Sequence, residues 1–578
     1  MGRVILAAVL AGLVGAGAVS ASWAQDSAAE QAQRRLSTAI QQADTLRKDG
    51  RDSPEARQQA KAVLLKVVDE ASASATRDLA EGSMSLRYMA YAARDRLFPI
   101  YVAEGDKARA LDAMLANFAQ DAELDLKIYH SDPAQALLKD EPRYRSMIAV
   151  TESLDRLWHA RAIAVPYKPE LSEAERIAGL SLFWSEAKYN FAHFNSVPDL
   201  DWDKAYLDFL PQVIAAKDTQ AYYDVMMRFA PLLRDGHTNI YPPQELQGHY
   251  YARPPLQTDL IGGRVLVTFV GSDMLTKQGI RVGDEITAID GVEVKRYAHE
   301  HVEPHESSST PQDMDVRKYT YGLLSGDKDT PVALSLDDGH GHKRTVTIAR
   351  NNYPDRHGPP EFEFKMLPGN VAYLAIDHFE SEASVKALEN HLPQIMQAKG
   401  LILDVRRNGG GSDSYGFGIL SHLTDAPIPS AQQRRLSVDP LSRANGNLSL
   451  EWLQVDGSRA TYPHQTAPIY RGPVAVLIGP QTFSAAEDFV MSFDTLKRGI
   501  LVGRPTGGST GMPMSFRLPG GGSARICVKW DSYPDGREFV GTGIAPQIAV
   551  APTVADVRAG RDIAVERARR ALLGEAGR

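Results

Sequence analysis

The chain has 578 residues, a formal net charge of -8 and one cysteine, with 43% hydrophobic and 24% charged residues. That length corresponds to about three or four domains of an ordinary soluble globular protein. A negatively charged chain without a basic stripe is not expected to bind nucleic acid. A single cysteine excludes an internal disulfide and a cysteine-rich zinc site.

Residues 1–24 have the pattern of a secretory signal peptide. Arg3 precedes an apolar run from Val4 to Val19, and the small residues Ser22 and Ala24 stand at the −3 and −1 positions of a cleavage site. The run is Gly-rich and shorter than the ~20 residues that span a bilayer. We therefore expect an exported protein, periplasmic or extracellular, with no stable membrane insertion after cleavage.

Residues 25–166 are predicted to form a helical region. Helix-forming residues recur with apolar spacing in Ala60–Val68, Leu79–Leu97 and Ala108–Phe118. Part of this region resembles a tetratricopeptide-type hairpin, but no period repeats three times, so a full solenoid is not predicted. It carries no visible chemistry, and we expect it to dock a protein partner or to mediate self-association.

Residues 167–252 are again predicted to be helical and are rich in aromatic residues. They include the loop Asp235-Gly-His-Thr238, which follows a helix and precedes a Pro pair. The sequence contains fifteen histidines. A lone histidine is more often structural than catalytic, so the local pattern does not mark His237 as functional.

Residues 253–352 change to short strands. In Gly279–Val294 an Asp-Gly turn joins two of them. The run Val282-Gly-Asp-Glu-Ile-Thr-Ala-Ile-Asp-Gly291 resembles a PDZ domain, and such domains add an extended peptide to a sheet edge and capture its carboxylate. The alternative is a PDZ-shaped spacer that binds nothing. A segment from His301 to Lys328 interrupts the pattern.

Residues 353–578 alternate strand and helix, as in an α/β core. We predict strands at Val371–Ile376 and Gly400–Arg406 with a helix at Ser384–Ala398 between them. The glycine run of Asn408–Ser412 lacks the Lys-Ser/Thr pair of a Walker loop, so nucleotide binding is not expected. A polar, proline-rich excursion at residues 425–466 is predicted to be a flap or strap near the site.

One serine follows a buried strand and begins a helix. The strand is predicted at Pro473–Gly479, the turn carries Ser484, and the helix runs from Asp488 to Lys497. Free backbone N–H groups at a helix N-terminus favour negative charge beside an attacking hydroxyl. The simplest local interpretation is different, because Ser484 and Glu487 also have the spacing of a capping box.

The motifs together resemble the tail-specific, or C-terminal-processing, family of serine peptidases. In chain order they are Asp-Gly-His-Thr, the PDZ-like run, Asp-x-Arg-x-Asn-Gly-Gly-Gly, Thr-x-Ser-Ala-Ala-Glu, Gly-x-Pro-Thr-Gly-Gly-Ser and Gly-x-Gly-Ile-x-Pro. The resemblance covers about residues 170–578. It implies an α/β fold with a crotonase-like ββα core and an inserted PDZ domain, and the all-α N-terminal region lies outside it.

The resemblance also implies roles for individual residues. One branch of the family uses a Lys base, and here Ser509 stands at the Lys position. The tricorn-like branch uses a His before the PDZ domain, and this chain fits that pattern. Carried over, Ser484 would be the nucleophile and His237 its general base.

The same resemblance places the oxyanion hole on backbone N–H groups. One would belong to Ala485 and the other to Gly409 or Gly410. No metal or cofactor is implied, because no histidine pair has zincin spacing and no phosphate loop is complete.

Two positions depart from the tricorn-like pattern. Gly236 stands where that branch has a Ser before the base, and Val540 stands where it has a Glu. Glu538 lies on the same face of a regular strand as Val540. Glu538 is therefore our candidate for orienting His237, with Asp535 as the alternative.

The sequence thus predicts an exported serine endopeptidase acting on polypeptides with exposed C-termini, recruited through the PDZ domain. A second hypothesis is a catalytically inactive, peptidase-like protein that binds peptides. A third is hydrolysis of a non-peptide acyl substrate by the same Ser–His pair.

Overall fold

The computed structural model describes residues 28–73, 76, 86, 88–121, 124–158, 162–447, 450–454, 461–462 and 468–575. The expected signal peptide, residues 1–24, lies outside these residues. The chain divides into two compact units, Met1–Gln120 and Asp121–Arg578. None of the described helices is both long enough and apolar enough to cross a membrane.

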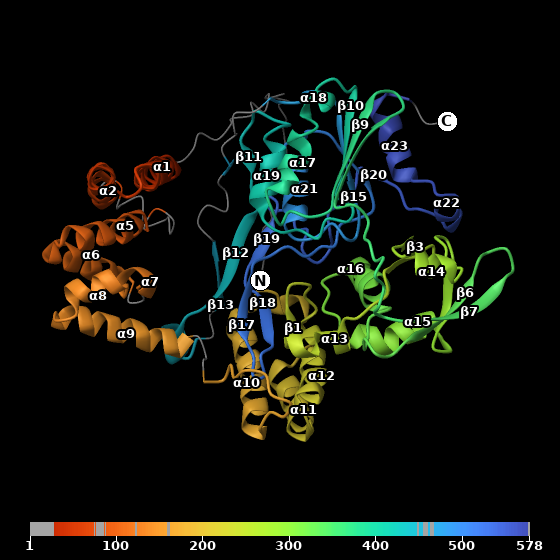
Figure 1. The fold of residues 1–578 in the computed structure, drawn as a ribbon, viewed down its shortest axis with the longest axis horizontal. Coiled ribbons are helices and arrows are strands. Elements are labelled where there is room, and N and C mark those ends of the chain that lie inside the picture. The colour runs from red at the N-terminus through yellow and green to blue at the C-terminus, as the bar shows by residue number, and fades with distance from the viewer. Residues whose placement is uncertain are drawn as a thin grey trace, which may run out of the picture. The chain divides into compact units, whose positions relative to one another are not determined.

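The described part of the first unit consists of helices that pack on their neighbours in the chain (Figure 1). They are α1 (Ala28–Asp49), α2 (Pro54–Ser72), α5 (Met89–Glu104) and α6 (Lys107–Gln120). Ser53 caps α2 by accepting a hydrogen bond from the Ala56 N–H, and Gly105 ends α5 at a φ of 70°. The buried helix faces carry small and aliphatic side chains such as Leu64 and Leu97.

The second unit begins with a series of helices. They are α7 (Leu126–Tyr129), α8 (Asp132–Leu138), α9 (Pro142–Trp158), α10 (Glu173–Asn190), η1 (Phe194–Ser196), α11 (Trp202–Ala215), α12 (Thr219–Phe229), η2 (Ala230–Leu233) and α13 (Gln244–Tyr250). Aromatic packing holds α10 to α12 together, and the rings of Trp202 and Phe229 stack 4.5 Å apart. These contacts give the His237 loop a rigid support.

A three-stranded sheet joins that loop to the C-terminal part of the chain. Its order is β1 (Asn239–Tyr241), β18 (Ser523–Cys527) and β17 (Pro513–Arg517), all antiparallel. His237 lies two residues before β1, so its backbone is anchored to a strand almost 290 residues further along the chain.

The middle of the second unit is a separate antiparallel sheet with the order β2-β3-β4-β6-β7. Its elements are β2 (Leu256–Ile261), β3 (Arg264–Val270), α14 (Asp273–Lys277), β4 (Glu285–Ile289), β5 (Val292–Glu293), α15 (Val294–Tyr297), β6 (Val332–Asp337) and β7 (Lys343–Ile348). The predicted Asp-Gly turn is confirmed, because Asp290 and Gly291 both have positive φ between β4 and β5. The interrupting segment is helical: η3 (Ala298–Val302), η4 (Glu303–His305), α16 (Pro311–Val316) and η5 (Arg317–Gly322).

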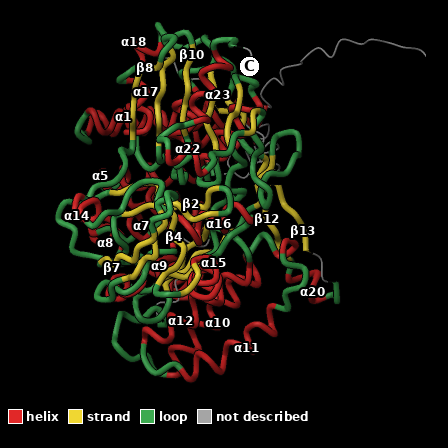
Figure 2. The backbone as a smooth tube through the Cα atoms, turned by 90° about the vertical axis from the view of Figure 1, so that its right-hand side faces the viewer, coloured by secondary structure: helices red, strands yellow, loops and turns green. Residues whose placement is uncertain are grey.

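The α/β core is built on a six-stranded sheet with the order β20-β16-β15-β10-β9-β8. Its strands are β8 (Phe362–Leu367), β9 (Val371–Ile376), β10 (Gly400–Asp404), β15 (Val474–Ile478), β16 (Ile500–Gly503) and β20 (Ile548–Ala549). All pairs are parallel except β8 with β9. Several of these strands run side by side, in yellow, in the upper part of Figure 2.

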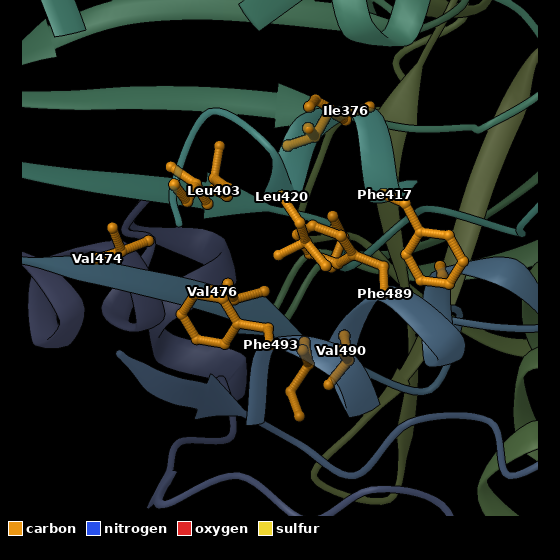
Figure 3. Close-up of a cluster of buried hydrophobic side chains, with 14 of the residues drawn as sticks. Ile376, Leu403, Phe417, Leu420, Val474, Val476, Phe489, Val490 and Phe493 are labelled. Atoms are coloured by element: carbon orange, nitrogen blue, oxygen red, sulfur yellow. The ribbon is translucent and has the colours of Figure 1, made fainter. Parts of the chain in front are cut away.

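Both faces of this sheet are covered. The helices are α17 (Ala383–Glu389), α18 (Leu392–Ile395), α19 (Asp413–Leu420), α21 (Ala485–Thr495) and α23 (Ile563–Leu572), whereas α22 (Val554–Arg558) contacts β3 of the other sheet. Leu403 and Val476 pack against Phe489 and Phe493 of α21 on one face (Figure 3). Ile402 belongs to the opposite core cluster, with Ala568 of α23. Burial on both faces explains why these strands are continuously apolar.

One predicted helix is wrong in detail. Ser384–Ala398 was expected to be a single helix, but it is divided into α17 and α18. Pro393 lies in the first turn of α18, where its missing N–H costs nothing, whereas inside a longer helix it would break a hydrogen bond.

The excursion at residues 425–466 contains a hairpin in its described part. Its elements are β11 (Ile428–Pro429), β12 (Gln432–Val438), α20 (Pro440–Ala444), β13 (Leu450–Gln454) and β14 (Thr461–Tyr462). β12 pairs with β13 and also with β19 (Trp530–Ser532). The guanidinium of Arg434 lies over the rings of Trp452 and Trp530, which holds the hairpin to the C-terminal part of the chain.

Candidate active site

Ser484 lies in a strained turn between β15 and α21. Its φ of 57° and ψ of −130° are rarely adopted by a residue with a side chain. Neighbouring segments hold the turn: the Ser484 N–H donates to the Ser509 carbonyl (3.2 Å), and the Phe483 N–H donates to the Asn408 carbonyl (3.0 Å). The turn leaves the Ser484 hydroxyl at the start of α21.

The capping-box interpretation of Ser484 and Glu487 is wrong. The Ser484 side chain makes no capping hydrogen bond, and its Oγ atom contacts His237 instead. The Glu487 carboxylate instead accepts hydrogen bonds from Thr506 Oγ1 (2.6 Å), the Gly508 N–H (2.8 Å) and the Ser509 N–H (2.8 Å). Glu487 therefore stabilises the neighbouring loop and does not close the helix end.

His237 reaches the serine from a loop 247 residues earlier in the chain. Its Nε2 atom lies 3.0 Å from the Ser484 Oγ atom. The imidazole is 3% exposed and stacks on the Phe483 ring, with 4.8 Å between ring centroids. Asp235 organises the loop, because its Oδ2 atom accepts from the His237 N–H (3.2 Å) and from the Thr238 hydroxyl (2.6 Å).

The surroundings of His237 keep its imidazole neutral. Burial, opposed by the Asp235 carboxylate and reinforced by the nearby cations Arg525 and Arg317, lowers its pKa to about 3. A neutral imidazole at neutral pH can accept the proton of the Ser484 hydroxyl. The geometry and the protonation state therefore agree with a serine–histidine pair.

The second ring nitrogen of His237 contacts another serine. Nδ1 lies 3.0 Å from the Ser509 Oγ atom. The prediction that Glu538 orients His237 is wrong: the Glu538 carboxylate binds the Trp530 indole N–H and Arg434 (2.7 Å).

Glu538 lies away from His237 because the chain turns where the sequence pattern predicts a regular strand. Gly536 has a φ of 87°, and the chain reverses there so that Glu538 lies opposite Ser532. The alternative candidate, Asp535, is exposed and pairs with Arg537 at 2.8 Å. Neither carboxylate is a recorded hydrogen-bond partner of His237.

The glycine run after β10 lies beside the serine. A Cβ atom added to Gly410, whose φ is 99°, would be 2.7 Å from the Ser484 Cβ atom and 3.0 Å from the Ala485 nitrogen. The Gly410 N–H donates to Asn408 Oδ1 (2.9 Å). Within the described residues, the N–H groups of Gly409 and Ala485 donate no recorded hydrogen bond. Of the two glycines predicted for an oxyanion hole, Gly409 thus has its N–H available.

A cleft of about 610 Å³ opens at these residues. Its lining combines His237, Ser484, the glycine run at Gly409 and Gly411, and the start of β17. Charged side chains also line it, among them Asp413, Asp488, Arg525 and Lys529. Ser484 therefore lies in the wall of a cleft with both charged and uncharged lining residues.

One group of described residues could in principle ligate a metal. Atoms of His193, Asp235 and Cys527 lie within 4.8 Å of one another, and all three residues are buried. Each already has a protein partner: His193 Nε2 and Cys527 Sγ contact the Lys529 carbonyl, and Asp235 accepts the two hydrogen bonds described above. These contacts make the group a hydrogen-bonded support for the His237 loop.

The sequence did not reveal two residues of this site. In the sequence, Ser509 is distinguished only by standing at a Lys position, and the spacing of Glu487 from Ser484 indicates a helix cap. Neither sequence pattern indicates which groups Ser509 and Glu487 contact, because these contacts join segments that are far apart in the chain.

The site places a histidine within hydrogen-bond distance of a serine at a helix N-terminus. This is the geometry of serine hydrolases. Comparison with known proteins narrows this class. Residues 370–550 match the model of peptidase family S41. The matched segment contains Ser484, and it is similar to this family of serine peptidases.

Individual relatives are distant. The chain is 22% identical over 357 residues to the chloroplastic C-terminal processing peptidase of Tetradesmus obliquus, which covers 57% of this chain and 68% of the relative. It is 25% identical over 204 residues to the tail-specific protease of Haemophilus influenzae, covering 34% of this chain and 26% of the relative. The structure of mature CPAF is similar with a TM-score of 0.55 and 16% identity, covering 70% of this chain and 98% of that one. At that identity the similarity to CPAF is one of fold: mixed α/β with an extensive helical N-terminal region.

Proposed function

We propose that this chain is an endopeptidase that hydrolyses polypeptides with Ser484 as nucleophile and His237 as general base. The observation that carries the proposal is the 3.0 Å contact between His237 Nε2 and Ser484 Oγ at the N-terminus of α21. The similarity to peptidase family S41 supports the choice of a peptide bond as substrate.

The reaction follows from the positions of these groups. Ser484 Oγ attacks the carbonyl carbon while its proton moves to His237 Nε2. The carbonyl oxygen gains negative charge, which the free N–H groups of Ala485 and Gly409 stabilise, each by about 3 kcal/mol of barrier. The carbon–nitrogen bond then breaks, and the protonated His237 gives its proton to the departing amine. Water, deprotonated by the same imidazole, hydrolyses the acyl-enzyme and restores Ser484.

The first test uses a reactive probe and a broad peptide library. The wild type should be labelled by a fluorophosphonate and should cleave the library, whereas Ser484→Ala should do neither. His237→Ala should also escape labelling, because the hydroxyl then has no base. A wild type that binds peptides but is neither labelled nor active would favour the inactive binding protein. Cleavage of acyl esters without cleavage of peptides would favour a non-peptide acyl substrate.

We also propose that the sheet of residues 253–352 acts as a PDZ domain and recruits the C-termini of substrates. A cavity of about 670 Å³ lies between this region and the helices before it. Arg253 and Arg317 line it together with tyrosines such as Tyr251 and Tyr321. Arg317 is already paired with Asp313, so the Arg253 guanidinium, among aromatic rings, is the group that suits a terminal carboxylate.

The contacts of η5 affect how such a peptide could bind. The Thr258 hydroxyl of β2, the edge strand, donates to the Tyr319 carbonyl of η5. Strand addition along β2 would require η5 to move, so the cavity is the more accessible place for a terminal carboxylate.

Paired peptides with a free or an amidated C-terminus test this recruitment. The amide should raise KM by about 10-fold or more, because a charge-assisted hydrogen bond is lost, and kcat should be unchanged. Arg253→Gln should remove the difference between the two peptides. Equal KM values for both peptides in the wild type would contradict recruitment through a terminal carboxylate.

Export is the third part of the proposal, and it is supported by the sequence pattern of residues 1–24. Expression of the full chain in a Gram-negative host should yield a periplasmic or secreted protein whose first residue is Gln25. An unprocessed protein in the cytoplasmic fraction would contradict export.

A further inference from the structure

Ser509 is a loop residue that contacts both members of the proposed catalytic pair. Its Oγ atom lies 3.0 Å from His237 Nδ1, and its carbonyl accepts the Ser484 N–H at 3.2 Å. Its exposed fraction is 0%, so water does not compete for these contacts. A base that accepts a proton at Nε2 carries its hydrogen on Nδ1, and the Ser509 hydroxyl is the acceptor that faces it.

We propose that Ser509 is a positioning residue whose hydroxyl oxygen accepts the Nδ1 hydrogen of His237 and fixes the imidazole for proton transfer from Ser484. This inference rests on the proposed function. It assigns to a serine the orienting contact for which a carboxylate was expected.

Glu487 holds Ser509 in place. It is fully buried, and its two carboxylate oxygens accept the N–H groups of Gly508 and Ser509 together with the Thr506 hydroxyl. Burial raises the pKa of Glu487 to about 7, and the three donors oppose that rise. Because Glu487 lies three residues after Ser484 on α21, the same helix positions the nucleophile and the residue that supports its base.

The space at Gly236 supports the same assignment. A Cβ atom added there would lie 3.0 Å from Ser509 Oγ, 2.9 Å from the Phe483 ring and 3.0 Å from Arg317 Nη2. Any side chain at position 236 would therefore press on the Ser509 hydroxyl. A glycine at this position leaves room for Ser509 to approach the imidazole.

A neutral hydroxyl orients an imidazole but does not balance the charge of the protonated ring. The Asp235 carboxylate faces His237 and raises its pKa against the lowering effects of burial, Arg525, Arg317 and His193. Orientation and charge compensation are thus separated: Ser509 provides the first, and Asp235 provides the second through space. In a Ser-His-Asp triad one carboxylate does both.

The decisive experiment measures Ser509→Ala beside Ser515→Ala, a matched control on the exposed part of β17. For Ser509→Ala we expect kcat and the rate constant of fluorophosphonate labelling to fall about 10- to 100-fold, as for a misplaced catalytic group. KM and the final extent of labelling should remain at the wild-type values. A purely structural role would instead lower the extent of labelling, because part of the protein would be misfolded. Ser515→Ala should match the wild type in every measurement.

Two other variants keep the test decisive if Ser509→Ala does not fold. Ser509→Cys preserves the size of the side chain but accepts hydrogen bonds weakly, so its kcat should also fall. Gly236→Ala leaves Ser509 unchanged and should reduce kcat by displacing its hydroxyl. Folding is checked by thermal unfolding.

The outcomes separate this inference from the proposed function. If Ser484→Ala is inactive while Ser509→Ala or Ser509→Cys stays within about 3-fold of the wild type, the positioning role is wrong and the proposed function stands. If Ser484→Ala retains hydrolysis and labelling, the proposed function is wrong, and the role of Ser509 is wrong with it.

Discussion

The supports of Ser484 and His237 differ in kind. Ser484 lies between a strand and a helix that are adjacent in the chain and share one hydrophobic core with Val476 and Phe489. His237 lies in a loop whose contacts come from separate segments: Ser309 and Arg317 of the interrupting segment, Ser509, and the strand β18. The nucleophile thus rests on one strand–turn–helix unit, to which the carbonyls of Asn408 and Ser509 add two contacts, whereas the base depends wholly on how distant segments meet.

This difference has a functional consequence. The Gly236 N–H donates to the Ser309 hydroxyl (3.0 Å), and Arg317 Nη2 donates to the Gly236 carbonyl (3.3 Å). Arg317 also lies over the Phe483 ring, which stacks on His237. A movement of the segment that carries Ser309 and Arg317 would therefore displace His237 more directly than Ser484.

The largest effect is expected when the nucleophile itself is removed. Ser484→Ala should lower kcat/KM by a factor on the order of 10⁴ to 10⁶, because no covalent intermediate can form. Thermal unfolding should be nearly unchanged, since the hydroxyl caps no helix. Steady-state kinetics with a cleaved library peptide measures the loss, and residual activity above 1 part in about 10³ would contradict it.

A core substitution should affect stability and leave the remaining folded enzyme active. Leu403→Ala removes a fully buried side chain beneath α21 and should lower the free energy of unfolding by about 2–5 kcal/mol. Denaturant unfolding measures this change. The kcat per labelled site should stay close to that of the wild type, and a proportional fall in kcat would show that the core also tunes the catalytic geometry.

Arg317→Met, close to the His237 loop, should have the opposite effect to Leu403→Ala, because it should lower kcat. It removes the contacts with the Gly236 carbonyl and the Phe483 ring while keeping an apolar stem. We expect kcat to fall about 10- to 100-fold as the imidazole loses its alignment. Asp313, which pairs with Arg317 at 2.8 Å, loses its partner, so stability must be measured in parallel. An unchanged kcat would show that the segment does not support His237.

The pH dependence of kcat/KM tests how the charges around His237 shift its pKa. His237 acts only when neutral, and its pKa is lowered to about 3, so the acid limb of kcat/KM should lie well below the 6.5 of an ordinary histidine. Arg525→Gln removes a cation that disfavours the protonated ring, so it should raise the pKa of His237 and move the acid limb to higher pH. A pH–rate profile measures both. A limb that moves to lower pH would mean that Arg525 does not act through its charge.

The smallest effect is expected for Ser309→Ala. It removes one hydrogen bond to the Gly236 N–H, and the remaining contacts still hold the loop. We expect kcat to fall by about 3- to 10-fold, equivalent to about 1 kcal/mol. Kinetics with the same peptide, compared with Ser515→Ala, is sufficient. A loss as large as that of Arg317→Met would show that Ser309 has a second role.

Much of the core could be predicted from short-range patterns. Continuous apolar runs between Pro and Gly correspond to β9, β10 and β15, because strands buried on both faces have no polar alternation. The Asp290-Gly291 turn also follows from local backbone preference. Other predictions failed where one residue changed the local path, as Pro393 divided a helix and the turn at Gly536 redirected Glu538.

The sequence by itself indicated the α/β core, the resemblance to a peptidase family, and the serine and histidine that the structure brings together. Each of these depends on residues that are close in the chain or on motifs in a fixed order. Only the tertiary structure decided which atoms surround the imidazole: Ser509 at Nδ1, Asp235 nearby, and Glu538 elsewhere. The physical reason is that hydrogen bonds are directional over about 3 Å, whereas the segments that meet at the His237 loop are separated by up to 289 residues.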